Sequence, residues 1–381
     1  MLLFKPAEVE ARLREQAAAG AFPGAAALWG RPLSTPALAL AGHRGSSRDR
    51  QPVTADLIYD LASVTKVLAT TSLAMILTAR GLLEPARPLT EIAPLAKIMP
   101  REFTASSFWR RVTAGHLLAH QSGLTAWRPF YRLGGVSPAA RRAAALTALS
   151  EAEPEAEPGR RTIYSDLNFI LLGFLLEALA ETTLDDLFKR EIAEPLNLAA
   201  AGFRPLNGPL APTEDGFRWG GPIGHSEAHI FGPTPLGRVN DDNAAWLGGV
   251  AGHAGLFAPV RDVWALAEDW GRAWKSGPGL IFDRLVLAEF LRPRPTLKDP
   301  GRPWGFNRLG NIAGLARSPL SPAAVGHTGY TGPAVWWDAD NDFLWVLLCN
   351  RVHPRAANPA WRPGLVQGGL IASGQNDNID G

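Results

Sequence analysis

Hydrophobic and polar positions along the chain form short apolar runs near both ends, separated by a long stretch of helical pattern. In residues 1–20, apolar positions recur at helical spacing among charged ones, which predicts an amphipathic helix on the surface. Residues 24–30 and 37–42 are apolar runs joined by a proline-containing turn, and residues 57–60 form a third brief run. We predict three strands there, because short apolar runs bounded by turn residues are typical of strands.

A longer apolar run at 67–83 predicts a buried central helix, because it is apolar on nearly every side. Arg80 and Gly81 close it, and glycine suits the left-handed position after a helix end. From about 85 to 240 the pattern is that of helices broken by proline and glycine. We predict helices at 114–120, 138–150, 167–181 and 184–192, and a long ordered loop at 204–238.

After one more predicted helix at 262–274, the pattern of the last third is that of strands. We predict these at 313–317, 324–327, 333–338 and 343–351. If the early and late strands share one sheet, the helical stretch between them is an insertion. The sequence then predicts an α/β (α+β) sheet domain at 1–62 and 240–381 and a mostly helical domain at 63–239. The cleft between two such domains is a common place for an active site.

Composition supports a large core and excludes several partners. Of 381 residues, 46% are apolar and 19% are charged, which excludes a disordered chain. The net charge of +2 argues against nucleic acid or an anionic membrane as a partner. The single cysteine, Cys349, excludes an internal disulfide and a cysteine-ligated metal cluster. There is no run of about 18 consecutive apolar residues and no secretory-signal pattern, so we expect a cytoplasmic protein without a membrane partner.

Ser63 and Lys66 lie one helical turn apart at the start of the central apolar stretch. A serine at a helix start has backbone N–H groups and the positive end of the dipole beside its hydroxyl, and the lysine shares its face. Serine becomes a nucleophile when an adjacent base takes its proton, and burial lowers the pKa of a lysine so that it can be that base. The alternative is a serine N-cap followed by a solvated lysine, but Lys66 lies in an apolar run where a solvated side chain would be misplaced.

Tyr164, Ser165 and Asp166 come directly before the helix predicted at 167–181. A phenol near a lysine can act as a general acid or base. Alternatively, Ser165 or Asp166 caps the helix and Tyr164 packs against it. The two interpretations are compatible, because a capped helix start also fixes Tyr164.

A glycine-rich segment, GHTGYTG at 326–332, lies between two of the predicted late strands. Glycine at such a place lets a ligand approach the backbone closely. The main-chain N–H that follows Gly329 is placed to stabilise a developing oxyanion. Taken alone, the segment could also be a simple turn.

In this order, S-x-x-K, then Y-S-D about 100 residues on, then H-T-G about 160 residues later, resemble the motifs of the serine β-lactamase and penicillin-binding-protein superfamily. The likeness is closest to the branch of class C β-lactamases, carboxylesterases and D-aminopeptidases. It extends over about residues 20–355, through the blocks LIYDLAS, LLAHQSGL, YSDLNFILLG, GGVAGHAGLF and GHTG. The resemblance implies a β-lactamase/transpeptidase-like fold, an antiparallel sheet flanked by helices with a helical domain beside it.

Residue by residue, the resemblance implies that Ser63 is the acylated nucleophile and Lys66 its proton partner. Tyr164 would be the general base, or the shuttle to the leaving group. The N–H groups of Ser63 and Tyr330 would form the oxyanion hole. No metal or organic cofactor is implied. The substrate-binding residues that we predict are Asp166, Asn168, His327, Thr328, Gly329 and Tyr330.

Two departures from the family pattern bear on the substrate. Many relatives that process β-lactams carry asparagine where this chain has Asp166, and Asn168 lies two residues further on. The usual lysine of K-T-G is His327 here, so we expect carboxylate binding to be weak, or to strengthen when falling pH protonates this histidine. Both changes argue against an efficient β-lactamase. They are compatible with an esterase or a D-amino-acid peptidase or amidase that acts on a small molecule or short peptide, which is the function that we expect.

Three alternative functions remain: a true β-lactamase, a D-Ala-D-Ala carboxypeptidase, and a non-catalytic protein that binds peptides or cell-wall fragments. His116 and His120 have zinc-like spacing, but the segment between them lacks the glutamate of H-E-x-x-H, which argues against a metal. We also consider His253 as a ligand contact and the segment WGG at 219–221 as a loop at the edge of the site.

Overall fold

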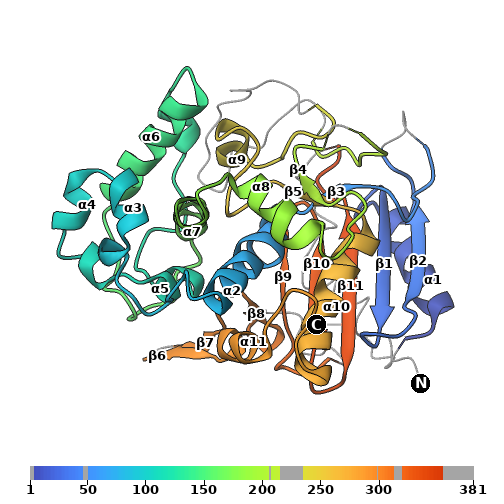
Figure 1. Cartoon of the computed structure of the whole chain (residues 1–381). Coiled ribbons are helices and arrows are strands. Elements are labelled where there is room, and N and C mark those ends of the chain that lie inside the picture. Colours follow the sequence, from blue (N-terminus) through green and yellow to red (C-terminus); the bar gives the residue numbers. More distant parts are fainter. Residues whose placement is uncertain are drawn as a thin grey trace.

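A six-stranded antiparallel sheet, in the order β2-β1-β11-β10-β9-β8, lies at the centre of the molecule (Figure 1). The computed structural model describes residues 4–45, 50–205, 207–214, 235–297, 299–312 and 320–354. The early strand β1 pairs with the late strand β11, with Ala25 opposite Cys349. Early and late strands therefore share one sheet, as predicted. The strands are β1 (Gly24–Gly30), β2 (Ala37–Gly42), β8 (Asn307–Arg308), β9 (Val325–Thr328), β10 (Ala334–Asp338) and β11 (Phe343–Cys349).

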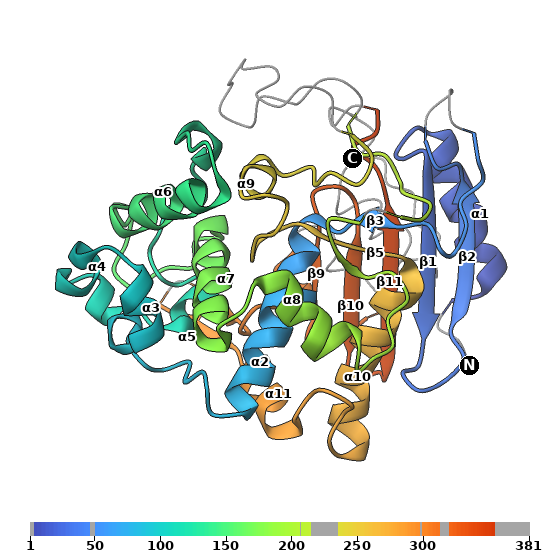
Figure 2. The same cartoon turned by 45° about the horizontal axis from the view of Figure 1, so that its top comes forward.

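Both faces of this sheet are covered, which explains why β1 and β11 are buried along their whole length. Alternate residues of a strand point to opposite faces. On β1, Ala27 and Trp29 belong to one core cluster with α1 (Pro6–Ala18), whereas Leu28 belongs to the cluster that includes α10 (Val260–Ser276). Figures 1 and 2 show these two helices on either side of the sheet. The continuous apolar runs of the sequence are therefore strands that pack on both faces.

The central helix differs from the uniform α-helix that its apolar pattern predicts. It begins with a 3₁₀ turn, Ala62–Val64, continues as a π-helical segment, Lys66–Thr71, and becomes α-helical only at α2 (Ser72–Ala79). π-Helical turns are rare and are frequent at functional sites. The predicted end is confirmed, because Gly81 follows the helix with a φ of +70°.

The segment Ala62–Ala79 is long and apolar enough, by length and composition alone, to cross a membrane. It is 83% buried inside the molecule, however, and core helices pass the same test. The bent pair Asp166–Ala180 and Leu184–Ala193 passes when it is counted as one span. This is weak evidence for a membrane segment, and burial accounts for the apolar composition of the central helix.

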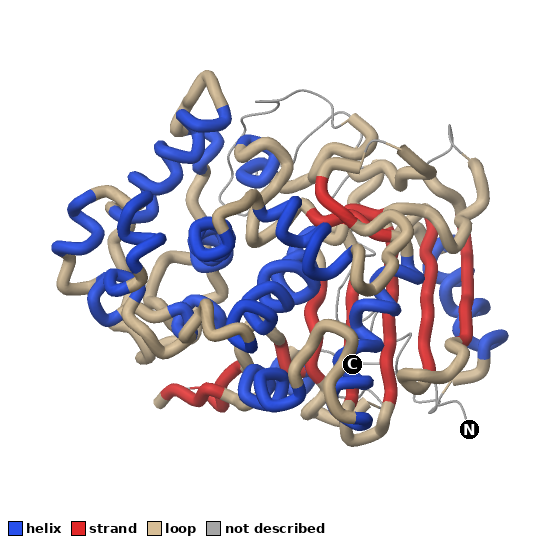
Figure 3. Tube along the Cα trace, viewed as in Figure 1, coloured by secondary structure: helices blue, strands red, loops and turns tan. Residues whose placement is uncertain are grey.

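Most helices between residues 93 and 188 gather on one side of the sheet (Figure 3). The predicted helix at 138–150 has exactly these bounds in the structure, and the others differ at their ends. Residues 167–176 of α7 are all buried, so this helix is the core of the helical part. The helices are α3 (Ala93–Ile98), α4 (Arg101–Ala105), α5 (Ala114–Leu118), α6 (Pro138–Ser150), α7 (Asp166–Ala180) and α8 (Leu184–Phe188).

Several short elements were not predicted, because pieces of two to eight residues carry little periodicity. The strand predicted at 313–317, the segment at 219–221 and most of the loop predicted at 204–238 lie outside the described residues. A three-stranded sheet has the order β3-β5-β4, and β6 and β7 form a separate hairpin. Of these, β3 (Tyr59–Asp60) lies within the strand predicted at 57–60, but it is part of the three-stranded sheet and not of the central one. The elements that were not predicted are β4 (Gly202–Phe203), β5 (Leu256–Ala258), β6 (Arg294–Thr296), β7 (Asp299–Arg302), α9 (Asp242–Trp246) and α11 (Arg284–Leu291).

Gly326 of β9 allows a test of how closely this sheet is packed. A Cβ at this position would overlap the carbonyl oxygen of Val335 on β10. We expect Gly326→Ala to lower the free energy of unfolding by about 1–3 kcal/mol, as overpacking does. Gly202→Ala is the matched control, because Gly202 is also a strand glycine and has nothing within 4 Å of its Cβ position. Equal urea midpoints for the two variants would contradict the expectation.

Candidate active site

Ser63 is held in place from the chain just before it. Ala62 has a φ of +45°, a left-handed conformation that is uncommon outside glycine. The carboxylate of Asp60 holds this turn, accepting the N–H of Ala62 at 2.8 Å and that of Asn240 at 2.7 Å. Asp60 is buried, so its two hydrogen bonds tie the serine turn to the segment before α9. Ser63 itself is half-buried at the start of the central helix.

Lys66 is fully buried, and its ammonium group meets three oxygen atoms. It donates to Ser63 Oγ at 3.0 Å and to the carbonyl oxygen of His253 at 3.1 Å. Asp166 Oδ1 lies 2.7 Å from the same nitrogen. The ammonium group thus donates two hydrogen bonds and forms an ion pair with Asp166. The predicted pairing of Ser63 with Lys66 is therefore present in the structure.

Burial acts on the pKa of Lys66 as expected, but it does not decide the net shift. The charges and hydrogen bonds of Asp166 and Tyr164 outweigh the effect of burial and raise the pKa above its usual value. Lys66 is therefore an ammonium ion at neutral pH. A protonated lysine cannot take the proton of a serine, so the raised pKa argues against Lys66 as the base.

Tyr164 lies over this cation with 38% of its surface exposed. Lys66 Nζ is 5.1 Å from the centroid of the phenol ring. The ring also packs against two imidazoles, His120 at 4.5 Å and His327 at 5.9 Å between centroids. Tyr164 is thus close to Lys66, as predicted, and its exposed side is open to a substrate.

The start of α7 is not capped as predicted. Neither Ser165 nor another side chain caps the helix. The hydroxyl of Ser165 donates instead to the carbonyl oxygen of Thr125 at 2.7 Å, and its backbone N–H donates to His120 Nδ1 at 3.0 Å. The carboxylate of Asp166 forms an ion pair with Lys66 instead of capping the helix. Asp166, predicted to bind substrate, is therefore first of all the counter-ion of the buried lysine.

The turn that follows β9 packs directly on the chain that precedes the serine. A Cβ on Gly329 would lie 2.6 Å from the carbonyl oxygen of Leu61, so only glycine fits there. Thr331 Oγ1 donates to the carbonyl oxygen of Asp60 at 2.7 Å. In the part of the chain that the structure describes, the N–H of Tyr330 has no protein acceptor. The structure thus packs the turn that contains Gly329, Tyr330 and Thr331 against the segment that leads into Ser63.

His327 is a neutral imidazole at pH 7. It is buried, and its Nδ1 lies 2.7 Å from the carbonyl oxygen of Thr328. Burial, and then the positive charges of Arg302 and Lys66, lower its pKa well below the usual value. The expected gain of a cation at mildly acidic pH is therefore wrong. A second cation besides Lys66 is Arg302 on β7, whose guanidinium carbon lies 5.3 Å from the Tyr164 ring centroid.

Asn168 does not line the site, so its prediction as a substrate-binding residue is wrong. Its side chain is fully buried, and its Oδ1 accepts the hydroxyl of Ser122 at 2.6 Å. Conversely, sequence reasoning missed Asp60 and Arg302, and it considered His120 only as a metal ligand. Arg302 carried no signal, because an isolated arginine in a short hairpin has no periodicity. The block LLAHQSGL was the available signal for His120.

Two carboxylates and a histidine lie close together beside Lys66. Single ligand atoms of Asp166, Asp241 and His253 all lie within 4.8 Å of one another, a spacing that could hold a metal ion. His253 Nε2 is 2.8 Å from Asp241 Oδ1. Burial acts to raise the pKa of Asp241, but the pairing with His253 and the N–H of Ala244 lower it to about 2. The Lys66 ammonium already neutralises Asp166, so the carboxylates have a resident cation. His253 reaches the site through its carbonyl oxygen.

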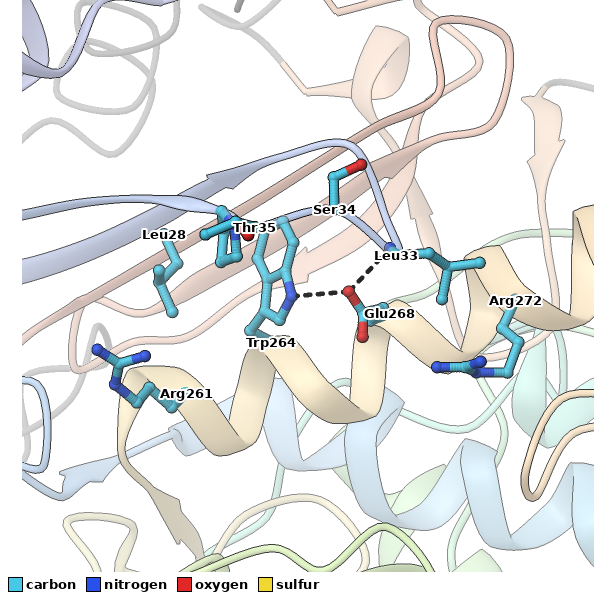
Figure 4. Close-up of a pocket in the computed structure, with 9 residues that line it drawn as sticks. Leu28, Leu33, Ser34, Thr35, Arg261, Trp264, Glu268 and Arg272 are labelled. Atoms are coloured by element: carbon cyan, nitrogen blue, oxygen red, sulfur yellow. Dashed lines mark hydrogen bonds between the residues drawn. The ribbon is translucent and has the colours of Figure 1, made fainter.

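A cavity of about 630 Å³ lies elsewhere, between the turn that joins β1 to β2 and helix α10 (Figure 4). Glu268 is at its centre and accepts the Trp264 indole N–H at 3.1 Å and the Leu33 N–H at 2.9 Å. None of its lining residues belongs to the serine site. Because Glu268 is already hydrogen-bonded and no nucleophile with a partner base is present, this cavity offers no hydrolytic chemistry.

A model of the Beta-lactamase family matches residues 9–368. The chain belongs to this family. A protein from Salmonella typhi named "Putative D-alanyl-D-alanine carboxypeptidase" is 29% identical over 344 residues, which cover 86% of this chain and 77% of that protein. The resemblance drawn from the motifs is thereby confirmed, and the chain is a hydrolase of the serine β-lactamase family.

Solved structures confirm the fold class. The structure titled "EstCE1, a hydrolase with promiscuous acyltransferase activity" has a TM-score of 0.73 and 21% identity, covering 96% of this chain and 98% of that one. The octameric penicillin-binding protein homologue from Pyrococcus abyssi has a TM-score of 0.69 and 19% identity, covering 97% and 77%. The family fold, an antiparallel sheet flanked by helices beside a helical part, is the fold of this chain.

The lowered pKa of His327 predicts a pH dependence of stability. Below about pH 6.5 the unfolded chain protonates this histidine, whereas the folded protein does not, so the free energy of unfolding falls as pH falls. We expect His327→Gln to remove roughly 1 kcal/mol per pH unit from the slope between pH 6 and 5. Urea unfolding at several pH values measures this. Identical slopes for the two proteins, in that range as well as above pH 7, would show that His327 is protonated in the folded state.

Proposed function

We propose that this chain is a serine hydrolase that cleaves ester or amide bonds through an acyl-enzyme on Ser63. The observation that carries the proposal is the 3.0 Å contact between Lys66 Nζ and Ser63 Oγ, at a lysine that is fully buried and paired with Asp166. Burying a charge is costly even when it is paired. A protein that only binds peptides or cell-wall fragments has no need for this charge beside a serine hydroxyl, so the geometry favours catalysis.

In the proposed reaction, Tyr164 acts in its phenolate form: it takes the proton of the Ser63 hydroxyl and becomes a neutral phenol, while the serine oxygen forms a bond to the substrate carbonyl carbon. The carbonyl electron pair moves onto its oxygen, which the N–H groups of Ser63 and Tyr330 stabilise. When the carbonyl re-forms, the bond to the leaving group breaks and Tyr164 returns its proton to that group. Water then attacks the acyl-enzyme in the same way. The Lys66 cation, which contacts Ser63 Oγ, stabilises the negative charge that develops on the serine oxygen.

Arg302 supports a narrower proposal, that substrates carry a carboxylate. Its guanidinium lies against the Tyr164 ring, and its charge lowers the pKa of His327 and of His120, so it lies near all three. A guanidinium keeps its charge at every physiological pH and binds carboxylates in bidentate geometry. We propose that Arg302 replaces the lysine that relatives carry at the place of His327. The name of the Salmonella protein agrees with a peptide that ends in a free carboxylate.

The nucleophile and its partners can be tested together. A fluorophosphonate should add a single label, on Ser63, and Ser63→Ala should abolish it. We expect Lys66→Ala and Tyr164→Phe each to slow labelling by about 10²–10⁴-fold. The double variant should be slowed by far less than the two single reductions multiplied together, because both residues act on one proton transfer. Ser72→Ala is the control, a buried serine whose hydroxyl donates to Val67 within the same helix. A label on another serine would contradict the proposal.

The carboxylate prediction needs a matched pair of esters, one neutral and one with a carboxylate. We expect Arg302→Gln to raise KM for the carboxylated ester by about 10–100-fold and to change KM for the neutral ester by less than about threefold, because a charge-assisted hydrogen bond is lost. Arg294→Gln is the control, since Arg294 pairs with Glu289 at 2.6 Å and stacks on Trp304.

In the unmodified protein, KM for the carboxylated ester should be constant between pH 6 and 8, because Arg302 keeps its charge and His327 stays neutral. A KM that falls steadily as the pH falls would instead assign carboxylate binding to a protonated His327. A penicillin, which also carries a carboxylate, tests the β-lactamase alternative in the same assay.

A further inference from the structure

His120 holds the chain on both sides of Tyr164. Its carbonyl oxygen accepts the N–H of Ile163 at 2.8 Å, and its ring Nδ1 accepts the N–H of Ser165 at 3.0 Å. Its imidazole also lies 4.5 Å from the Tyr164 ring and 5.0 Å from the Phe169 ring, measured between centroids. One residue thus fixes the backbone before and after the tyrosine and supports one face of its ring.

The backbone of His120 makes this double contact possible. Its φ is +56°, in the left-handed region that histidine adopts less readily than glycine or asparagine. His120 follows the C-terminal end of α5, where a left-handed residue reverses the chain direction. Such a conformation costs of order 1 kcal/mol and persists where the surrounding structure requires it. Here that requirement is the segment 163–165.

The ring of His120 has a defined protonation state. Because Nδ1 accepts the Ser165 N–H, the ring proton is on Nε2. Burial, and then the positive charges of Arg302 and Lys66, lower its pKa well below the usual value, so the ring stays neutral. Protonation would place a donor against the Ser165 N–H and break the contact. The acceptor at Nδ1 is therefore stable throughout the neutral pH range.

We propose that His120 is a positioning residue that aligns the Tyr164 phenol with Ser63 through its two contacts to the chain at 163 and 165. The inference rests on the proposed function, in which Tyr164 carries the proton. Its backbone contacts set the direction of the tyrosine, and its ring prevents the phenol from turning toward the space that His120 fills. Misplacing a proton-transfer group by about 1 Å can cost 10²-fold in rate.

Three variants separate the features of His120. Asparagine tolerates the left-handed backbone and places its amide oxygen where Nδ1 lies, so His120→Asn should keep kcat within about fivefold. His120→Gly keeps the backbone conformation without any acceptor, and His120→Gln carries its amide too far along the side chain to reach Ser165. For both we expect kcat to fall by about 10–100-fold with KM little changed, because alignment and not binding is lost.

A double-substitution cycle then shows whether the effect passes through the tyrosine. In the Tyr164→Phe background, His120→Gly should cost less than about twofold in kcat, since no proton-bearing phenol remains to be aligned. A loss of equal size in both backgrounds, or an asparagine variant as slow as the glycine variant, would overturn the proposal. If the glycine variant does not fold, the asparagine and glutamine variants provide the same comparison.

Failure of this proposal is distinguishable from failure of the proposed function. Full activity of Ser63→Ala or of Tyr164→Phe would contradict the proposed function itself. Normal sensitivity to those two substitutions, with kcat unchanged in every His120 variant, would overturn only the positioning role. Thermal unfolding of each His120 variant shows that the comparison is made between folded proteins.

Discussion

The buried ammonium of Lys66 is the interaction on which the rest of the site depends. A charge without water must be matched by nearby oxygen atoms, and here they come from three separate parts of the chain. Ser63 belongs to the same helix start, Asp166 begins α7, and the carbonyl of His253 belongs to the segment before β5. Removing any one of them leaves a buried cation poorly matched, so the charge also holds these segments together.

This pairing decides which groups carry protons. With Asp166 beside it, Lys66 stays charged, and the proposed reaction therefore assigns the proton transfer with Ser63 to Tyr164. The two imidazoles that pack on the phenol stay neutral because they are buried near Arg302 and Lys66. The site therefore contains two fixed cations and a phenol between uncharged rings, an arrangement suited to stabilising negative charge on oxygen.

The central sheet is connected to the Ser63 turn through a few direct contacts. Gly329 and Thr331, which follow β9, pack on Leu61 and Asp60, and Asp60 in turn holds the left-handed turn at Ala62. The turn that follows β9 and the turn that leads into Ser63 are thus parts of one hydrogen-bonded unit. Because the strands behind it are buried on both faces, this unit has little freedom to move.

The sequence by itself determined the features that depend on local pattern. Its apolar runs predicted β1 and β2 exactly and located β10 and β11, and its motifs predicted that Ser63, Lys66 and Tyr164 would meet. Only the tertiary structure decided that Lys66 is charged and that Asn168 is buried away from a substrate. It also decided that Arg302 and His120 lie beside Tyr164. A pKa depends on distances between segments far apart in sequence, and such distances have no periodicity in the chain.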